Sequence, residues 1–343
     1  MIVPTRQSDA AAVRQTGAMA GKAQESRHGV SLTNLDQPLF SDAGATKRQL
    51  VDYLDGVAER IIPTLRDRPL SVIRVQRDEA PFMQKNLPKY APDWVERVTL
   101  WAESSKRDVS YALCNDVRTL IWFGNQRAIE YHPTLIRIND PERVTDLVLD
   151  LDPPGGAAAD GFSRAVDVAI LVREALRGAG LDGAVKSSGA KGVHVFVPVD
   201  VASTSIDDAA AATRAIAGRA AALDPKLATT EFVKERREGK VFVDATRVGG
   251  ATVVSAYSPR ARPGVPVSFP LRWEDLTDAD PGDFTVHTAL ERLGERDPWA
   301  ELLPAPQRLD AALVAEGHEI PVGRVQAMHE GKRRARARRE ADG

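Results

Sequence analysis

Cysteine is nearly absent from this chain, which contains Cys114 alone among its 343 residues. A single cysteine excludes an internal disulfide and a zinc site built from several cysteines, and we interpret Cys114 as a small core residue. No apolar stretch approaches the ~20 residues of a membrane-spanning helix, so no membrane partner is expected. The N-terminus also lacks a continuous apolar signal core, which predicts a cytoplasmic protein.

Two further absences narrow the range of functions. No segment follows the Gly-x-x-x-x-Gly-Lys-Ser/Thr pattern of a P-loop, and no internal repeat is visible. Net charge is also low, −2 from 46 basic and 48 acidic residues, so the whole chain is not a polycation.

Basic residues nevertheless gather in three clusters on both sides of an acidic segment near the middle of the chain. Such an arrangement suits metal ions together with a polyanionic ligand, while each cluster alone is equally consistent with a solvated face. The clusters are Arg66, Arg68, Arg74 and Arg77; Lys234, Arg236, Arg237, Lys240 and Arg247; and Arg260, Arg262 and Arg272.

Composition divides the chain into three parts. Residues 1–30 are rich in Ala, Gly, Gln, Ser and Arg without clear periodicity, which predicts a disordered tail. Residues 31–300 are expected to form the catalytic domain, since a hydrophobic fraction of 43% is ordinary for a globular protein. Residues 301–343 are expected to form a helical segment and a basic tail, which either adds affinity for nucleic acid or only aids solubility.

Hydrophobic periodicity predicts a mixture of helices and strands. Helical spacing covers residues 46–65, with Thr46 as the N-cap, and residues 115–125, 162–178 and 205–223. Strand patterns cover residues 69–75, 128–131, 147–152, 193–199, 240–244 and 251–255. After Pro259 the chain is expected to be irregular and then helical from about residue 284. This order predicts an α+β fold with mixed β-sheets flanked by helices.

Two acidic residues end one of the predicted strands. Asp150 and Asp152 follow an apolar run and precede Pro153 and Pro154. Residues i and i+2 of a strand point to the same face, roughly 7 Å apart, and two carboxylates there require a neutralising cation. A pair of divalent metal ions meets that requirement and suits phosphoryl transfer. An Asp-Pro turn explains Asp152 as well, but it does not explain Asp150.

Asp244 is the best third ligand. It ends the apolar segment Lys240-Val-Phe-Val-Asp244 in the same way as the first pair ends its strand. Three carboxylates from two neighbouring strands can hold two cations about 4 Å apart.

A second constellation, Ser187-Ser-Gly-Ala-Lys-Gly-Val-His194, lies before and within a predicted strand. Glycines let backbone amides turn toward a ligand, and Lys191 supplies a point charge. His194 points away from the valine face of the strand, so the segment fits a triphosphate cradle. A simple hairpin turn with a structural histidine is the alternative when the segment is taken alone.

These segments resemble the polymerase domain of bacterial ligase D, a branch of the archaeo-eukaryotic primase superfamily. The resemblance runs in order from about residue 31 to about residue 275. It is carried by Leu149-Asp-Leu-Asp-Pro153, Ser188-Gly-Ala-Lys-Gly-Val-His194, Val241-Phe-Val-Asp244 and Ala256-Tyr-Ser-Pro-Arg-Ala-Arg262, and further by Leu32-Thr-Asn-Leu-Asp36, Pro81-Phe-Met-Gln-Lys85 and Ala91-Pro-Asp-Trp-Val95. No segment resembling a ligase or phosphoesterase follows, so we expect a stand-alone member similar to the actinobacterial Prim-PolC proteins.

The resemblance implies a primase-like catalytic core that adds nucleotides to primer 3′ ends at short DNA gaps or breaks, by a two-metal mechanism in DNA repair. Asp150, Asp152 and Asp244 would bind two Mn²⁺ or Mg²⁺ ions. A nucleoside triphosphate, with ribonucleotides preferred over deoxyribonucleotides, would be the substrate. The residues implied around it are Ser188, Lys191, His194, His132, Arg237 and Arg260.

The resemblance also implies a DNA surface. Phe82 would stack on a template base, and Lys47 would grip the downstream 5′-phosphate of a gap. Arg74 and Lys85 complete the predicted DNA-binding set. Gln37 stands where the family has a second lysine, and Met83 where a second aromatic residue is common, so 5′-phosphate recognition and template stacking are expected to differ. Gapped or primer-template DNA, a repair ligase and end-binding proteins are the implied partners of a nucleoid-associated monomer.

Two other functions compete with this prediction. A non-catalytic module that binds DNA gaps or ends would show affinity without metal-dependent incorporation, but it gains nothing from clustered carboxylates beside phosphate. A metal-dependent phosphohydrolase shares the carboxylates, but it requires neither Phe82 nor a triphosphate cradle.

Overall fold

The computed structural model describes residues 25–76, 79–102, 107–155, 160–248 and 251–323. Most of the predicted N-terminal tail and the basic C-terminal tail lie outside this range. The part of the tail that is described already forms a hairpin, β1 (Ser26–Arg27) with β2 (Val30–Ser31). No helix among the described residues is long and apolar enough to cross a membrane.

A six-stranded sheet carries the acidic residues. Its centre is β8 (Asp146–Asp152), which pairs antiparallel with β10 (Val193–Pro198) on one side and with β12 (Val241–Asp244) on the other. Beyond β10 lie β9 (Ala184–Ser187) and β13 (Pro270–Leu271), and beyond β12 lies the parallel strand β11 (Ala228–Thr229). Residues 147–151 of β8 are all buried, as the apolar run predicts for a central strand.

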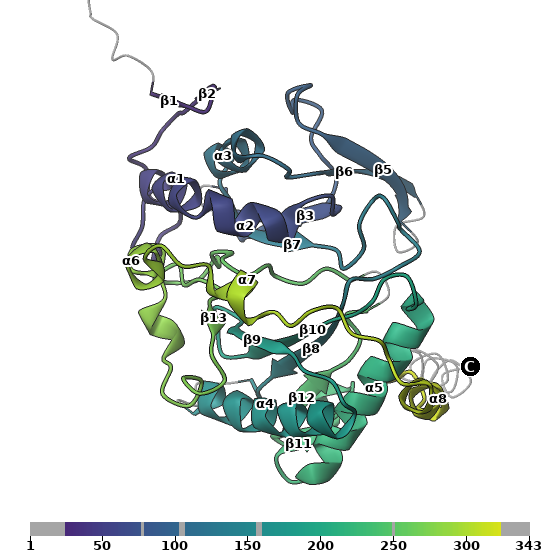
Figure 1. Cartoon of the computed structure of the whole chain (residues 1–343). Helices are drawn as coiled ribbons and strands as arrows, with labels where there is room; N and C mark the ends of the chain where they lie inside the picture. The colour runs from purple at the N-terminus through teal and green to yellow at the C-terminus, as the bar shows by residue number, and fades with distance from the viewer. Residues whose placement is uncertain (1–24, 77–78, 103–106, 156–159, 249–250, 324–343) are drawn as a thin grey trace, which may run out of the picture.

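Two long helices cover one face of this sheet (Figure 1). They are α4 (Gly161–Gly178) and α5 (Ile206–Leu223), and α8 (Ala311–Glu319) packs on α5 from outside. Alanines dominate the buried side of α5, and their small side chains let it lie close to both neighbours. In β8 and β10, apolar residues alternate with Asp150 and His194, so the apolar side chains and these polar side chains point to opposite faces of the sheet. The helices cover the apolar face, and the polar face is left for a site.

The second sheet forms the other half of the molecule in Figure 1. Its strand order is β4 (Phe82–Gln84), β3 (Leu70–Arg74), β6 (Arg107–Ala112) and β5 (Arg97–Ala102), and β7 (Ala128–Pro133) also pairs with β3. Helices α1 (Lys47–Gly56), α2 (Ala58–Leu65) and α3 (Val117–Asn125) lie beside this sheet. Thr46 is the N-cap of α1, as predicted, and it forms a capping box with Gln49. The single helix predicted over residues 46–65 is divided at Val57 into α1 and α2.

After β13 the described part of the chain contains a 3₁₀ turn, Pro281–Asp283, and the short helices α6 (Ala289–Leu293) and α7 (Pro298–Leu302), followed by α8. Another 3₁₀ turn, Lys234–Arg236, precedes β12. The buried Tyr53 in α1 donates a hydrogen bond to the carbonyl oxygen of Tyr257 at 2.7 Å. This bond connects the segment before β13 to the helices beside the second sheet.

The predicted strand at residues 251–255 is wrong. Only Thr252 forms a bridge, to Thr134, and Ser255 donates a further backbone hydrogen bond to Tyr131 at 2.9 Å. The segment therefore follows β7 without a regular ladder, and the positive φ of 65° at Tyr257 then turns the chain away. The remaining predicted helices and strands before Pro259 are present, with ends shifted by a residue or two, and the fold is α+β as expected.

Candidate active site

One row of charged and polar residues crosses the polar face of the six-stranded sheet. Lys186 on β9 is the cross-strand partner of His194 on β10, His194 is the partner of Asp150 on β8, and Asp150 is the partner of Asp244 on β12. Directly opposed residues have Cβ atoms about 5 Å apart, so strand register alone brings all four side chains together.

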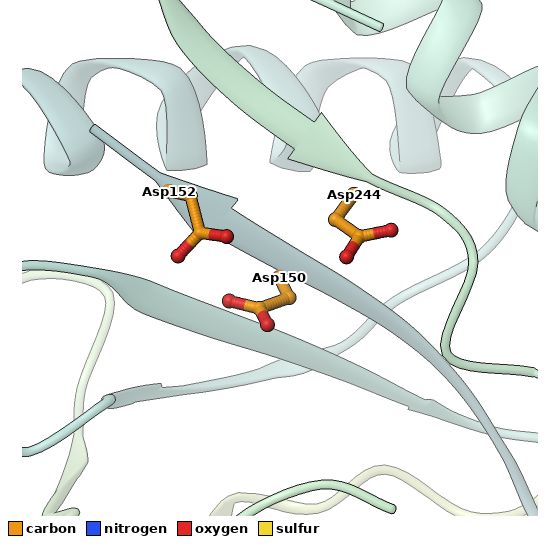
Figure 2. Close-up of side chains that lie close together, drawn as sticks. All are labelled: Asp150, Asp152 and Asp244. Atoms are coloured by element: carbon orange, nitrogen blue, oxygen red, sulfur yellow. The ribbon is translucent and has the colours of Figure 1, made fainter. Parts of the chain in front are cut away.

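Asp152 lies two residues farther along β8 and completes an acidic triad with Asp150 and Asp244. Ligand oxygens of the three lie within 4.8 Å of one another, and Figure 2 shows the carboxylates gathered on the side of the sheet opposite the helices. Burial, together with the charges of Asp150 and Asp244, raises the pKa of Asp152 to about 7. Three ionised carboxylates this close are costly without a cation, and clustered carboxylate oxygens are the donors that Mg²⁺ and Mn²⁺ prefer, so the triad fits divalent ions.

Arg247 supplies positive charge to the same cluster. Its Nη2 lies 2.6 Å from Asp150 Oδ2 and 3.0 Å from Asp244 Oδ2. Burial on its own would raise the pKa of Asp150, but His194 and Arg247 outweigh that effect and hold the pKa below its usual range. Asp150 is therefore ionised although only 7% of it is exposed.

His194 is fixed between a carboxylate and an amine. Its Nε2 lies 3.1 Å from Asp150 Oδ1, and its Nδ1 lies 2.9 Å from Lys186 Nζ. Because an ionised carboxylate only accepts, the proton of neutral His194 is on Nε2 and Nδ1 accepts from the lysine. Burial and the nearby Lys186 lower the pKa of His194 to about 4, so the ring is neutral at physiological pH.

Lys186 is itself fully buried. It donates to Ser268 Oγ at 2.6 Å, and burial followed by the charge of Arg260 holds its pKa well below the ordinary value. The lysine therefore orients His194 from the side remote from the acidic triad.

Glu130, in β7, holds two residues, His132 and Arg260, on the side of the site away from the acidic triad. Its Oε2 accepts from His132 Nε2 at 2.8 Å and lies 3.0 Å from Arg260 Nε, while Oε1 accepts from the amide of Ala261 at 2.9 Å. Burial works to raise the pKa of Glu130, but the hydrogen bond from His132 and the charge of Arg260 lower it to about 2. One carboxylate thus fixes both a histidine and an arginine.

The turn between β9 and β10 closes the site. Ser188 N donates to the carbonyl of Gly192 at 2.9 Å, Gly192 N donates back to Ser188 Oγ at 3.1 Å, and Arg260 donates to the carbonyl of Ser188. Gly189 has a φ of 68°, and a Cβ there would lie 2.6 Å from Arg260 Cγ. A Cβ on Gly192 would lie 2.7 Å from the carbonyl oxygen of Leu151. Both glycines are therefore required for the close approach of this turn to its neighbours.

A cavity of about 450 Å³ joins these elements. Seven of the predicted site residues line it: Asp150, Asp152, Ser188, Lys191, His194, His132 and Arg260. Its remaining lining residues are Pro153, Pro154, Gly155, Ala190, Gly192, Arg247, Thr252, Val253, Val254 and Arg262. An acidic floor beside several cationic groups can hold metal ions and a polyphosphate together.

The sequence matches the family described as the LigD primase-polymerase domain over residues 46–299. The chain belongs to this family. It is 30% identical over 297 residues to the bifunctional non-homologous end joining protein LigD of Bacillus subtilis, covering 85% of this chain and 46% of that protein. It is 33% identical over 302 residues to the multifunctional non-homologous end joining DNA repair protein LigD of Mycobacterium tuberculosis, covering 85% of this chain and 38% of that protein.

A solved structure agrees with the sequence comparison. The polymerase domain from Mycobacterium tuberculosis ligase D, in complex with DNA, matches this chain with a TM-score of 0.71 and 31% identity. The match covers 80% of this chain and 97% of that one, which supports the expected primase-polymerase fold. The chain spans less than half the length of the LigD proteins named above.

Arg237 is the predicted nucleotide-binding residue that does not line the cavity of this LigD-type domain. Its guanidinium lies 3.7 Å from the ring centroid of Phe242 and donates to the carbonyls of Glu231 and Phe232. Its charge still acts to lower the pKa of Asp152. Arg237 directly follows η1, Lys234–Arg236, and acts on the acidic triad through its charge without lining the cavity.

The predicted DNA-binding residues lie apart from the cavity on the second sheet and α1. Arg74 donates to Gln84 and Tyr90 at 2.8 Å each and lies 5.9 Å from the ring centroid of Phe82. Lys85 is exposed just beyond β4.

Lys47 is 3% exposed, and its Nζ donates to the carbonyl of Thr33 at 2.6 Å. Burial, and then the charge of Arg127, lower the pKa of Lys47 to about 8. The backbone amide of Lys47 donates to the carbonyl of Gln37 at 2.9 Å, so the two residues that the sequence prediction associates with 5′-phosphate recognition lie together.

Three residues of the site were missed by sequence reasoning. Glu130 stands two positions before His132 in a strand, so both were predictable on one face. Lys186 directly follows two apolar residues in the short strand β9, and a charged residue at such a position indicates a buried partner. Arg247 follows Asp244 by three positions, and nothing in the sequence indicates that it turns back onto the triad.

Proposed function

We propose that this protein is a DNA-dependent nucleotidyltransferase that adds nucleotides, with a preference for ribonucleotides, to primer 3′ ends at short gaps or breaks during DNA repair. The observation that carries the proposal is the cross-strand row from Lys186 to Asp244, which sets an acidic triad beside a cationic cavity. Phosphoryl transfer requires this combination, because metal ligands and phosphate ligands must meet within a few ångströms.

The cationic side of the cavity is suited to the triphosphate. Lys191 and Arg260 provide positive charge, and the hydroxyl and backbone of Ser188 provide polar groups at the tight turn. His132 is held by Glu130, and neutral His194 directs its Nε2 proton toward the metal side. These residues would bind and orient the nucleotide and offset the charge that develops on the leaving pyrophosphate.

Asp150, Asp152 and Asp244 would hold two divalent ions, Mn²⁺ or Mg²⁺. When bound, such ions lower the pKa of a primer 3′-hydroxyl and stabilise the pyrophosphate leaving group. Asp150 and Asp152 would also position the primer end, because both line the cavity that would receive the triphosphate.

The template and downstream DNA would lie on the second sheet and the N-terminal segment. Phe82 would stack on a template base, with Arg74 and Lys85 beside the backbone. Lys47 would approach a 5′-phosphate, because its buried amine and the nearby like charge of Arg127 together favour an anion there. Gln37 in place of a second lysine would weaken this contact, which favours gap filling over tight end binding.

We further propose a catalytic domain at residues 31–300 that acts as a monomer at the nucleoid, alongside a repair ligase and end-binding proteins. The family match at residues 46–299 supports the bounds of this domain, and the end-joining names of the LigD relatives support the repair partners.

Primer extension on a short-gapped duplex tests the proposed function. With Mn²⁺ present, the wild type should extend the primer and use ribonucleoside triphosphates better than deoxyribonucleoside triphosphates. The double variant Asp150→Ala, Asp152→Ala should bind the same DNA and extend nothing. Binding without incorporation from any triphosphate by the wild type would instead indicate a non-catalytic gap-binding module.

A further inference from the structure

Arg247 occupies the position between two of the three triad carboxylates. A single nitrogen, Nη2, contacts Oδ2 of both Asp150 and Asp244, at 2.6 and 3.0 Å. These two residues are cross-strand partners on β8 and β12, so the guanidinium bridges the strands at the centre of the acidic row.

A divalent ion held by Asp150 and Asp244 would require the same space. Carboxylate oxygens bind Mg²⁺ at about 2.1 Å, and a nitrogen in hydrogen-bond contact with both oxygens leaves no room for the ion between them. Arg247 also carries the same sign of charge as the ion. Metal and guanidinium therefore exclude each other sterically and electrostatically.

The guanidinium is less firmly held than the other cation of the row. Lys186 is completely buried and contacts both His194 and Ser268, whereas 30% of the Arg247 side chain is exposed. Its Nε is buried and has no hydrogen-bond acceptor among the described residues, and one nitrogen serves both carboxylates in place of a two-nitrogen fork. The contact neutralises the triad but leaves Arg247 incompletely bonded, as expected of a group that can be displaced.

We propose that Arg247 is a built-in counter-ion that competes with the metal for Asp150 and Asp244 and couples metal entry to nucleotide binding. Without a triphosphate, the guanidinium holds the two carboxylates and weakens metal binding. When a triphosphate enters the cavity that Arg247 lines, its oxygens would accept hydrogen bonds from the displaced guanidinium, and Asp150 and Asp244 would then be free to hold a metal ion. This inference rests on the proposed metal site, and its test is a binding measurement that does not depend on turnover.

The experiment is a titration of the full chain with Mn²⁺, in which the electron paramagnetic resonance signal reports free aqueous ion. Arg247→Gln removes the charge and keeps a side chain of similar polarity, and without nucleotide it should bind Mn²⁺ at least about tenfold more tightly than the wild type. Adding a nucleoside triphosphate with a non-hydrolysable α–β linkage should tighten Mn²⁺ binding markedly in the wild type and little in the variant.

Two matched variants isolate the cause. Arg247→Lys retains the charge and should bind Mn²⁺ within about threefold of the wild type. Arg262 lines the same cavity but is exposed and forms no ion pair with the triad in the described part of the chain, so Arg262→Gln should leave the Mn²⁺ affinity unchanged. Equal or weaker Mn²⁺ binding by a folded Arg247→Gln protein overturns the proposal.

A measurement on the wild type covers the case in which Arg247→Gln does not fold. Modification of arginines by phenylglyoxal, mapped by mass spectrometry, should be faster at Arg247 with saturating Mn²⁺ and no nucleotide than without Mn²⁺, because the displaced guanidinium then has no phosphate to pair with. An unchanged rate at Arg247 contradicts displacement. If Mn²⁺ binding is insensitive to Asp150→Ala in every background, the metal site of the proposed function fails, whereas Asp150-dependent binding that ignores Arg247 refutes this inference alone.

Discussion

Replacing Glu130 with glutamine tests the claim that one buried carboxylate fixes two groups of the nucleotide cavity. The side chain is 5% exposed and receives three contacts, from His132, Arg260 and Ala261. Glutamine keeps nearly the same shape, but it is neutral and leaves the buried Arg260 without its counter-ion. The substitution therefore removes charge rather than volume.

The pKa of Glu130 gives the expected size of the effect. The ordinary value of 4.5 falls to about 2 in the folded protein. A difference of about 2.5 pKa units, at about 1.4 kcal/mol per unit, means that ionisation of Glu130 contributes about 3.5 kcal/mol to stability at neutral pH. With an unfolding entropy of about 2.1 cal/mol/K per residue, a chain of 343 residues loses roughly 1.4 °C of Tm per kcal/mol, so Tm should fall by roughly 5 °C.

The pH dependence follows from the direction of the shift. A carboxyl whose pKa is lowered on folding stabilises the fold above its unfolded pKa, and this contribution is lost as pH falls through the folded pKa. The stability difference between wild type and Glu130→Gln should therefore be constant above pH 4.5 and shrink as pH falls toward 2.

Urea denaturation across this pH range measures the stability difference between wild type and Glu130→Gln. In steady-state kinetics, the KM of Glu130→Gln for nucleoside triphosphate should be raised about tenfold, because Arg260 is no longer held in place. Glu301→Gln is the matched control. Glu301 also pairs with an arginine, Arg296, but at an exposed site, and its loss should leave stability and KM close to the wild type. Equal stability of wild type and Glu130→Gln at neutral pH would refute the proposed role of Glu130.

Two further predictions concern DNA. Phe82→Ala should weaken binding of template-containing DNA by ~1–3 kcal/mol, measured by fluorescence anisotropy, with the KM for nucleotide unchanged; an effect on nucleotide alone would contradict template stacking. Lys47→Met should abolish any preference for a gap with a downstream 5′-phosphate over one with a 5′-hydroxyl, compared by extension of the two substrates, whereas a preference that survives the substitution would locate phosphate recognition elsewhere.

The acidic triad could be predicted from the sequence because each member ends an apolar strand, and alternation within β8 places Asp150 and Asp152 on one face. Local pattern does not reveal which strands are neighbours. The alignment of Lys186 and His194 with Asp150 depends on the strand order β9-β10-β8-β12, which long-range packing decides.

Contacts made after a strand ends were harder still to predict. Arg247 lies beyond β12, and its return to the triad depends on an irregular segment without periodicity. The prediction of a strand at residues 251–255 was wrong for the opposite reason. Their apolar, β-branched composition is typical of a strand, but they form only scattered hydrogen bonds with β7 and its end.

The most direct test of the account measures primer extension and pyrophosphate release together, on gapped DNA with Mn²⁺ and a single nucleoside triphosphate. A nucleotidyltransferase should release one pyrophosphate for each nucleotide added, and both products should disappear in Asp244→Asn. Inorganic phosphate release without chain growth, or chain growth that survives the loss of Asp244, would contradict the assignment of the acidic triad to nucleotidyl transfer.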